Sequence, residues 1–152
     1  MEYAKILPEF ITLVNETTVR KTVYTSSIIA IKFLEDLISK FTQNNNQIVV
    51  PVYKFDYYKL GNWNERYEYS YDMKRLFPLS IKEKRIVNCV SDAIDDGVSD
   101  PIKYCMIKSD ANEKLFSFLS KVLESSYWDL HPGNVMLDEN HEYKLIDLEG
   151  FL

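Results

Sequence analysis

Residues 129–134 read Asp129-Leu130-His131-Pro132-Gly133-Asn134, and Asp147 follows thirteen residues after the asparagine. Proline and glycine favour a turn in the middle of this stretch. Short apolar runs within residues 135–146, separated by a polar turn, predict a small hairpin directly behind it. A loop followed by a hairpin can bring Asp129, Asn134 and Asp147 to one point.

These three residue types are the ones that phosphoryl transfer needs. One carboxylate orients the acceptor hydroxyl, and oxygen ligands hold the magnesium ion that neutralises the phosphates. The spacing Asp-x-x-x-x-Asn, with a further Asp on the next hairpin, resembles the protein-kinase-like superfamily. Carried over, Asp129 matches the catalytic aspartate, and Asn134 and Asp147 match the metal-binding pair. The resemblance implies ATP and Mg²⁺ as cofactors.

The string Asp-Leu-His-Pro-Gly-Asn is more similar to the aminoglycoside-kinase and choline-kinase branch than to eukaryotic protein kinases, and so is Asp147-Leu148-Glu149. The structural alternative is a plain Pro-Gly turn at residues 129–134 with Asp147 as a surface carboxylate. For His131 two roles stay open. It acts on the transferred phosphate, or it braces the loop through a hydrogen bond.

The first half of the chain predicts a sheet with one helix. Apolar runs at residues 10–14 and 19–24 indicate a hairpin. Residues 27–42 carry apolar positions at helical spacing behind N-capping hydroxyls, and the polar tract 43–47 ends this helix. Two further strands are expected at about 48–55 and 66–71, with a turn at 60–62 between them.

Lys21 and Glu35 are the candidate nucleotide-binding residues. Lys21 lies where the superfamily has the strand lysine that binds phosphates, and Glu35 follows fourteen residues later in the expected helix. Glu35 falls at the margin of the apolar helix face, where a carboxylate needs a cation. The alternative is a Lys21 that snorkels from an edge strand while Arg20 or Lys32 partners Glu35.

The second half predicts helices at residues 81–94 and 112–124, with breaks at 95–97 and 99–101. The expected fold class is α+β: a minimal, truncated protein-kinase-like fold with an N-terminal antiparallel sheet, one helix and a reduced helical C-terminal lobe. It forms one domain over residues 1–152. Residues 1–76 are the expected nucleotide-binding lobe, in which the backbone near 72–76 receives the adenine, and 77–152 hold the catalytic loop.

Three features depart from the superfamily. No glycine precedes Gly61, so residues 15–18 would have to replace a Gly-rich phosphate loop. Tyr127-Trp128 stands where regulated protein kinases have His-Arg, which argues against control by activation-loop phosphorylation. Five residues follow Asp147, so we expect the activation segment and the substrate-binding helices to be missing. This economy is similar to the early serine/threonine kinases of short-tailed bacteriophages.

Composition narrows the setting. The formal net charge of -5 provides no broad basic field for nucleic acid. Cys89 and Cys105 have neither metal-ligand nor disulfide-framework spacing, which is typical of reduced thiols. The N-terminus does not resemble a signal peptide, and no apolar run approaches the roughly 20 residues of a membrane span. We therefore expect a cytoplasmic protein with no membrane partner, located in the bacterial host if the chain is phage-encoded.

The sequence thus predicts an ATP- and magnesium-dependent kinase that phosphorylates Ser or Thr of a host protein during phage infection. One alternative is a catalytically weak or inactive kinase-like module that binds and inhibits a host protein. A further alternative is a kinase for small hydroxylated molecules. The acidic residues Asp92, Asp95, Asp96 and Asp100 contact a basic partner or form a solvated loop.

Overall fold

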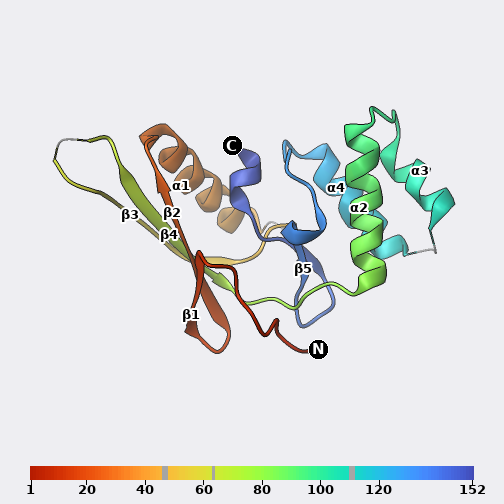
Figure 1. Ribbon diagram of the computed structural model, residues 1–152, viewed down its shortest axis with the longest axis horizontal. Coiled ribbons are helices and arrows are strands. Elements are labelled where there is room, and N and C mark those ends of the chain that lie inside the picture. The colour runs from red at the N-terminus through yellow and green to blue at the C-terminus, as the bar shows by residue number, and fades with distance from the viewer. Residues whose placement is uncertain (46–47, 63, 110–111) are drawn as a thin grey trace. The chain divides into compact units, whose positions relative to one another are not determined.

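The structure, a computed structural model, describes residues 1–45, 48–62, 64–109 and 112–152. The chain divides into two compact units, Met1–Leu76 together with Leu152, and Phe77–Phe151. This division lies where the sequence was divided into two lobes, while the roles assigned to the lobes remain predictions. Across the described residues the chain is a small α+β protein with a four-stranded antiparallel sheet and four α-helices (Figure 1).

The first unit is built on the sheet. Its strands are β1 (Ile11–Asn15), β2 (Thr18–Thr25), β3 (Val52–Lys59) and β4 (Tyr67–Lys74), in the spatial order β1-β2-β4-β3. All neighbouring strands are antiparallel. The expected hairpin at the start of the chain is confirmed as β1 and β2.

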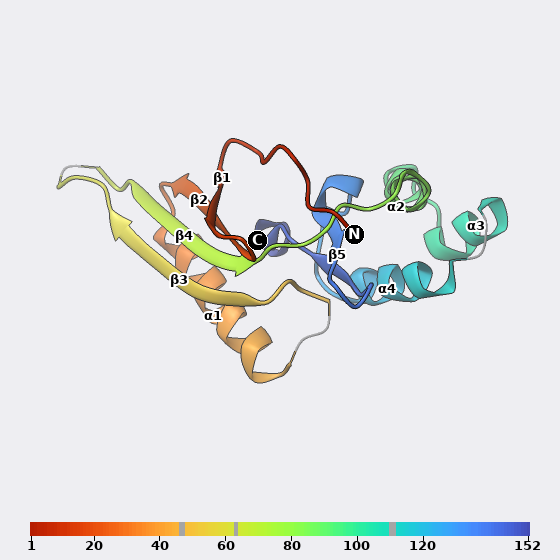
Figure 2. The ribbon, with the colours of Figure 1, turned by 90° about the horizontal axis from the view of Figure 1, so that it is seen from below.

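Helix α1 (Ile28–Gln43) covers one face of this sheet (Figure 2). Ser27 caps the helix, because its hydroxyl accepts a hydrogen bond from the Ala30 N–H at 3.1 Å. Ile31 and Leu34 are completely buried on the inner side. The helix predicted for residues 27–42 is therefore confirmed. Residues 46–47, part of the polar tract expected to end it, lie outside the described residues.

Strand β3 begins later than predicted. Val49 and Val50 are buried as core residues, but the regular strand starts at Val52 rather than near residue 48. The reason is Pro51, which has no N–H to donate to a strand ladder. The proline carbonyl still accepts from Lys74 N–H at 3.0 Å. The expected turn before β4 is present, with Gly61 at a φ of 80° that favours glycine.

The second unit holds α2 (Ile81–Asp95), α3 (Pro101–Lys108), α4 (Glu113–Glu124) and a small hairpin of β5 (Val135–Leu137) and β6 (Tyr143–Leu145). Two short 3-10 turns, η1 (Pro132–Asn134) and η2 (Leu148–Phe151), flank the hairpin. The expected helices at 81–94 and 112–124 are confirmed as α2 and α4. In the described part of the chain, no helix is long and apolar enough to cross a membrane.

Helix α3 was not predicted, because the residues that begin it resemble a chain break. The Asp100 side chain accepts a hydrogen bond from the Lys103 N–H at 3.1 Å, and Pro101 occupies the first helical turn. Aspartate at the N-cap followed by proline is also a favoured way to start a helix. Of the four acidic residues considered above, Asp92 and Asp95 lie in the last turn of α2, Asp96 is its C-cap and Asp100 is the N-cap of α3, so the four do not share one loop.

The core of the second unit is assembled around α4. This helix buries Leu115, Leu119 and Val122 completely. Leu145 at the end of β6 and Leu148 in η2 are also fully buried. The segments on both sides of Asp147 are therefore anchored in the core. This anchoring fixes the position of the Asp147 backbone.

Candidate functional site

The loop before β5 has a fixed shape. The Asn134 N–H donates to the carbonyl of His131 at 3.0 Å and closes the η1 turn. The Gly133 N–H donates to Nδ1 of His131 at 3.1 Å. A Cβ on Gly133 would lie 2.9 Å from Cε1 of the same imidazole, so a side chain at this position would displace the His131 ring.

The side-chain amide of Asn134 joins the two predicted aspartates. Its Nδ2 donates to the backbone carbonyl of Asp129 at 2.8 Å, and lies 3.3 Å from Oδ2 of Asp129 and 3.3 Å from Oδ2 of Asp147. All three contacts are oxygen acceptors, which supports this assignment of the amide nitrogen; to offer its oxygen to a cation beside Asp147, the amide would have to turn over. Asn134 is 6% exposed. The structure thus brings the three predicted catalytic residues together inside the second unit.

The hairpin sets the position of Asp147. Val135 pairs with Leu145, and the Ile146 N–H donates to the carbonyl of Asn134 at 3.1 Å. These bonds tie the residue before Asp147 to the end of the loop that holds Asp129 and Asn134. Two residues that are thirteen positions apart in sequence are therefore held side by side by backbone pairing.

Tyr127 supports the site from behind. Its hydroxyl donates to the backbone carbonyl of Asp147 at 2.8 Å. Its ring packs edge-on against Phe151, with ring centroids 4.8 Å apart. A Cβ on Gly150 would lie 2.2 Å from the Tyr127 ring, so only glycine fits there. Trp128 N–H donates to the Gly150 carbonyl at 3.0 Å and closes this cluster.

The environment of Tyr127 is strongly polarised. Burial raises the pKa of this phenol well above its usual range, and the nearby carboxylates of Asp147 and Asp129 raise that pKa further. The hydroxyl therefore stays protonated and remains a donor. Sequence reasoning missed Tyr127 as a site residue, because it treated Tyr127-Trp128 only as the loss of a His-Arg pair. The contact between the Tyr127 ring and Gly150 depends on η2 packing against residues 127–128, and no pattern in the sequence shows that packing.

His131 braces the loop. Its Nδ1 accepts from Gly133 N–H, so in the neutral imidazole the proton sits on Nε2. That Nε2 lies 3.8 Å from Oδ2 of Asp129. Of the two roles considered for His131, bracing is the one with a contact in the structure, and a role toward phosphate stays a prediction.

The donor set suits magnesium. Asn134 and Asp147 offer an amide oxygen and a carboxylate, and Mg²⁺ is commonly held by one or two carboxylates with waters and phosphate oxygens completing its shell. Two carboxylates that share one amide donor repel each other, and a divalent cation relieves that repulsion. No group of three or more His, Cys, Asp or Glu able to hold a metal is found among the described residues.

Lys21 lies on the inner face of β2. Val19 and Lys21 are the buried positions of the strand, and Lys21 is 9% exposed. It pairs across the sheet with Tyr71, which is completely buried. Its Nζ lies 5.4 Å from the centroid of the Phe10 ring. A lysine on a buried face is unusual, and this placement suits a functional cation.

Glu35 lies on the exposed side of α1. Its carboxylate is 3.8 Å from Nζ of Lys32, one turn earlier in the helix. Arg20, the other alternative partner, pairs instead with Asp72 at 2.6 Å. Lys32 is therefore the partner observed among the alternatives named from sequence, and the pair of Lys21 with Glu35 stays a prediction.

No protein-family model matches this chain, and no curated protein matches it either.

Proposed function

We propose that the chain is an ATP- and magnesium-dependent phosphotransferase of the protein-kinase-like type. The observation that carries this proposal is the Asn134 amide, which lies 3.3 Å from a carboxylate oxygen of both Asp129 and Asp147. An amide and two carboxylates at one point, buried on one side by Tyr127, form the oxygen-rich site that phosphoryl transfer needs.

Each residue has a role in this proposal. Asp129 orients the acceptor hydroxyl and takes up its proton. Asn134 and Asp147 hold the magnesium ion, which when bound neutralises charge on the phosphates. Lys21 binds the phosphates and Glu35 holds it, while the backbone near residues 72–76 receives the adenine. The acceptor is a Ser or Thr of a protein. More specifically, we propose a host protein that is modified in the bacterial cytoplasm during phage infection.

A second candidate, a kinase-like module that binds and inhibits a host protein, is favoured by the β1–β2 turn. There Oδ1 of Asn15 accepts from the Thr17 N–H at 3.0 Å and from the Thr17 hydroxyl at 3.2 Å. These donors are taken up within the turn, and Glu16 places a negative charge at its tip. Such a turn is poorly suited to bind phosphates. If nucleotide binding is weak, binding of the host protein is the function that remains.

Phosphate transfer tests the proposal directly. Purified protein, Mg²⁺ and ATP labelled at the γ-phosphate should label proteins of a bacterial lysate. Asp129→Asn should lower the rate by roughly 10²- to 10⁴-fold, because it deletes the group that accepts the hydroxyl proton. Asp95→Asn, an exposed isosteric change in α2, is the matched control and should leave the rate unchanged. Equal labelling by wild type and Asp129→Asn would refute the assigned mechanism.

The acceptor class and the binding alternative need separate readouts. Labelling of small hydroxylated molecules and not of lysate proteins would assign the chain to small-molecule kinases. For the binding module, the double variant Asp129→Asn with Asp147→Ala is expressed in a bacterial host and compared with wild type. If this folded variant still produces the full effect on the host, catalysis is not how the protein works.

A further inference from the structure

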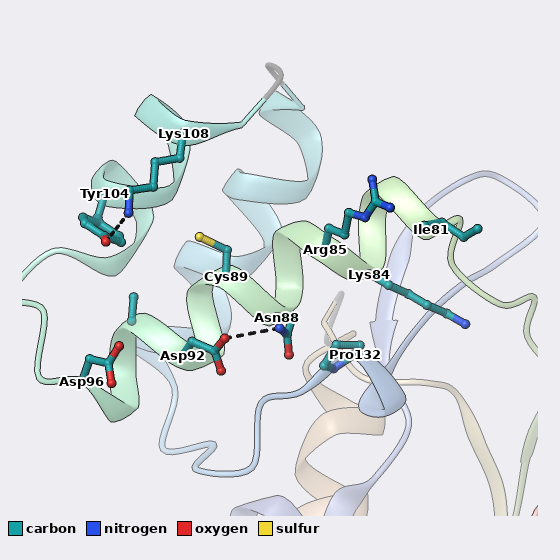
Figure 3. A pocket seen from close by; sticks show the side chains of 11 residues that line it. Ile81, Lys84, Arg85, Asn88, Cys89, Asp92, Asp96, Tyr104, Lys108 and Pro132 are labelled. Carbon is teal, nitrogen blue, oxygen red and sulfur yellow. Dashed lines mark hydrogen bonds between the residues drawn. The ribbon is translucent and has the colours of Figure 1, made fainter.

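The second unit contains a long cavity of about 680 Å³ outside the catalytic cluster. One wall is a single face of α2, contributed by residues at every third or fourth position from Ile81 to Asp96. Tyr104 and Lys108 of α3 line it on one side of α2, and Pro132 of the proposed catalytic loop lines it on the other (Figure 3). The cavity is therefore a groove that follows α2 and reaches the catalytic loop.

The groove is elongated and open. Fifteen helical steps from Ile81 to Asp96 correspond to about 22 Å. Ile81 is 70% exposed, and the charged residues along the groove are exposed as well. A small ligand is usually held in a concave pocket that buries most of its surface, which an exposed groove does not provide. An extended polypeptide rises about 3.3 Å per residue, so about six to seven residues would fill the groove.

Charge changes sign along the groove. Lys84 and Arg85 lie toward the start of α2, and Asp92 and Asp96 lie at its end, with uncharged residues between them. A helix is stabilised by acidic residues at its start and basic residues at its end. These four charges follow the opposite order, so the helix dipole does not explain them; of the four, Asp92 accepts a hydrogen bond within α2, from Nδ2 of Asn88 at 3.3 Å. Among the described residues, Lys84, Arg85 and Asp96 form no ion pair.

We propose that this groove is a docking site for an extended segment of a partner polypeptide, with Lys or Arg against Asp92 and Asp96 and with Asp or Glu against Lys84 and Arg85. Eleven helical steps separate Arg85 from Asp96, about 16 Å, so the opposite charges of the segment lie about five residues apart. Nucleic acid is disfavoured, because its phosphates would face the two aspartates.

This docking site goes beyond the proposed transfer activity, because binding in the groove needs neither ATP nor magnesium. If the protein is a kinase, the docked segment belongs to the acceptor and is held beside Pro132, next to the loop that carries Asp129. If the protein is a binding module, the same groove holds the target. Binding and transfer can therefore be tested separately.

Fluorescent peptides of identical composition provide the test, with anisotropy as the readout in the absence of nucleotide. Two peptides carry a pair of lysines, a neutral spacer of about four residues and a pair of glutamates, in either order, and a third interleaves the same charges. We call the two peptides with separated charges two-ended. We expect one of them to bind roughly tenfold tighter than the interleaved peptide, as two to four partly exposed ion pairs allow. Its affinity should fall with added salt.

Variants identify the groove. Asp92→Asn with Asp96→Asn should weaken the two-ended peptide roughly tenfold. Lys84→Gln with Arg85→Gln should have a comparable effect. The matched controls are Asp95→Asn and Lys82→Gln, which change exposed charges on α2 outside the groove and should leave the affinity unchanged. Thermal melts followed by circular dichroism check that each variant is folded.

Three results would overturn the docking site: no saturable binding up to about 1 mM peptide, equal affinity for the interleaved peptide, or equal losses in the groove variants and the controls. Peptide binding as expected without phosphate transfer would refute the proposed enzyme and leave the groove in place. Phosphate transfer without peptide binding would refute the docking site and leave the proposed enzyme in place.

Discussion

The phenol of Tyr127 donates a hydrogen bond to the backbone carbonyl of Asp147 across twenty residues of sequence, with an oxygen-oxygen distance of 2.8 Å. The same ring lies against Gly150, where a Cβ would approach to 2.2 Å. One buried side chain therefore sets both the position of Asp147, the aspartate proposed to bind magnesium, and the path of the turn behind it. The first two predictions follow from this contact.

Tyr127→Phe should separate the hydrogen bond from the packing. The ring stays against Phe151, but the Asp147 carbonyl loses the hydrogen bond from the Tyr127 hydroxyl and keeps only the longer one from the Gly150 N–H, at 3.3 Å. The loss of one such hydrogen bond costs about 1 kcal/mol of stability. The proposed transfer rate should fall while the KM for ATP changes little, because only the orientation of Asp147 is loosened. Urea unfolding and steady-state kinetics measure the two effects. An unchanged rate would show that Asp147 is held without Tyr127.

Gly150→Ala should be strongly destabilising. The added methyl would meet Cε1 of Tyr127 at 2.2 Å, and overpacking of this kind costs about 1–3 kcal/mol. In a Tyr127→Ala background the same change should cost much less, because the clashing ring is gone. A double-mutant cycle by urea unfolding measures this coupling. Additive effects of the two substitutions would contradict the close packing.

Asp147→Ala should abolish the response to magnesium while leaving the protein folded. Wild type should melt at a higher temperature with ATP and Mg²⁺ than with ATP and a chelator, because a ligand that binds the folded state stabilises it. The variant should lose most of this difference, together with the proposed transfer activity. Asp138→Asn is unsuitable as a control, because Asp138 accepts two backbone hydrogen bonds in the hairpin turn. Asp95→Asn serves instead.

Lys21 and Glu35 should behave differently on substitution. Lys21→Met should weaken ATP binding at least about tenfold by removing a phosphate-binding cation. Glu35→Gln should weaken ATP binding as well if the predicted pair forms in the nucleotide complex, and should have no effect if Lys32 remains its partner. Isothermal titration with ATP and Mg²⁺ distinguishes these cases. Lys40→Met, an exposed lysine in the last turn of α1, is the matched control.

Glu83 should contribute to acid sensitivity. Its carboxylate accepts from the Tyr143 hydroxyl at 2.5 Å and from the Ser80 N–H at 2.9 Å. Burial raises the pKa of Glu83, but the hydrogen bonds from Tyr143 and Ser80 and the charge of His141 outweigh burial and lower it. A carboxylate with a lowered folded-state pKa stabilises the protein above its unfolded pKa, and this stabilisation is lost as the pH falls through the folded value.

Urea unfolding between about pH 6 and pH 3 measures this contribution. Wild type should lose stability toward the acidic end, and Glu83→Gln, which keeps an oxygen acceptor but does not titrate, should lose less over the same interval. Identical slopes would show that the hydrogen bonds of Glu83 do not depend on its charge.

The sequence by itself determined the elements whose free energy is local. Helices α1 and α4 follow from apolar residues at helical spacing behind capping side chains, and the grouping of Asp129 with Asn134 follows from a short loop. The position of Asp147 could also be predicted, because a hairpin of three-residue strands brings its two ends close together. These terms act over a few residues, so they can be interpreted without knowing the rest of the fold.

Only the tertiary structure decided the remainder. Asp100 and Pro101 suit both a break and a helix start, and the burial of Cys105 on α3 accompanies the second outcome. Three cations that precede Glu35 in the sequence were candidate partners, and in the structure its carboxylate lies 3.8 Å from Nζ of Lys32. The contact of Tyr127 with Gly150, and the lining of the α2 groove by α3 and Pro132, depend on segments that are distant in sequence. Packing between such segments is selected by the whole core, and no local pattern records it.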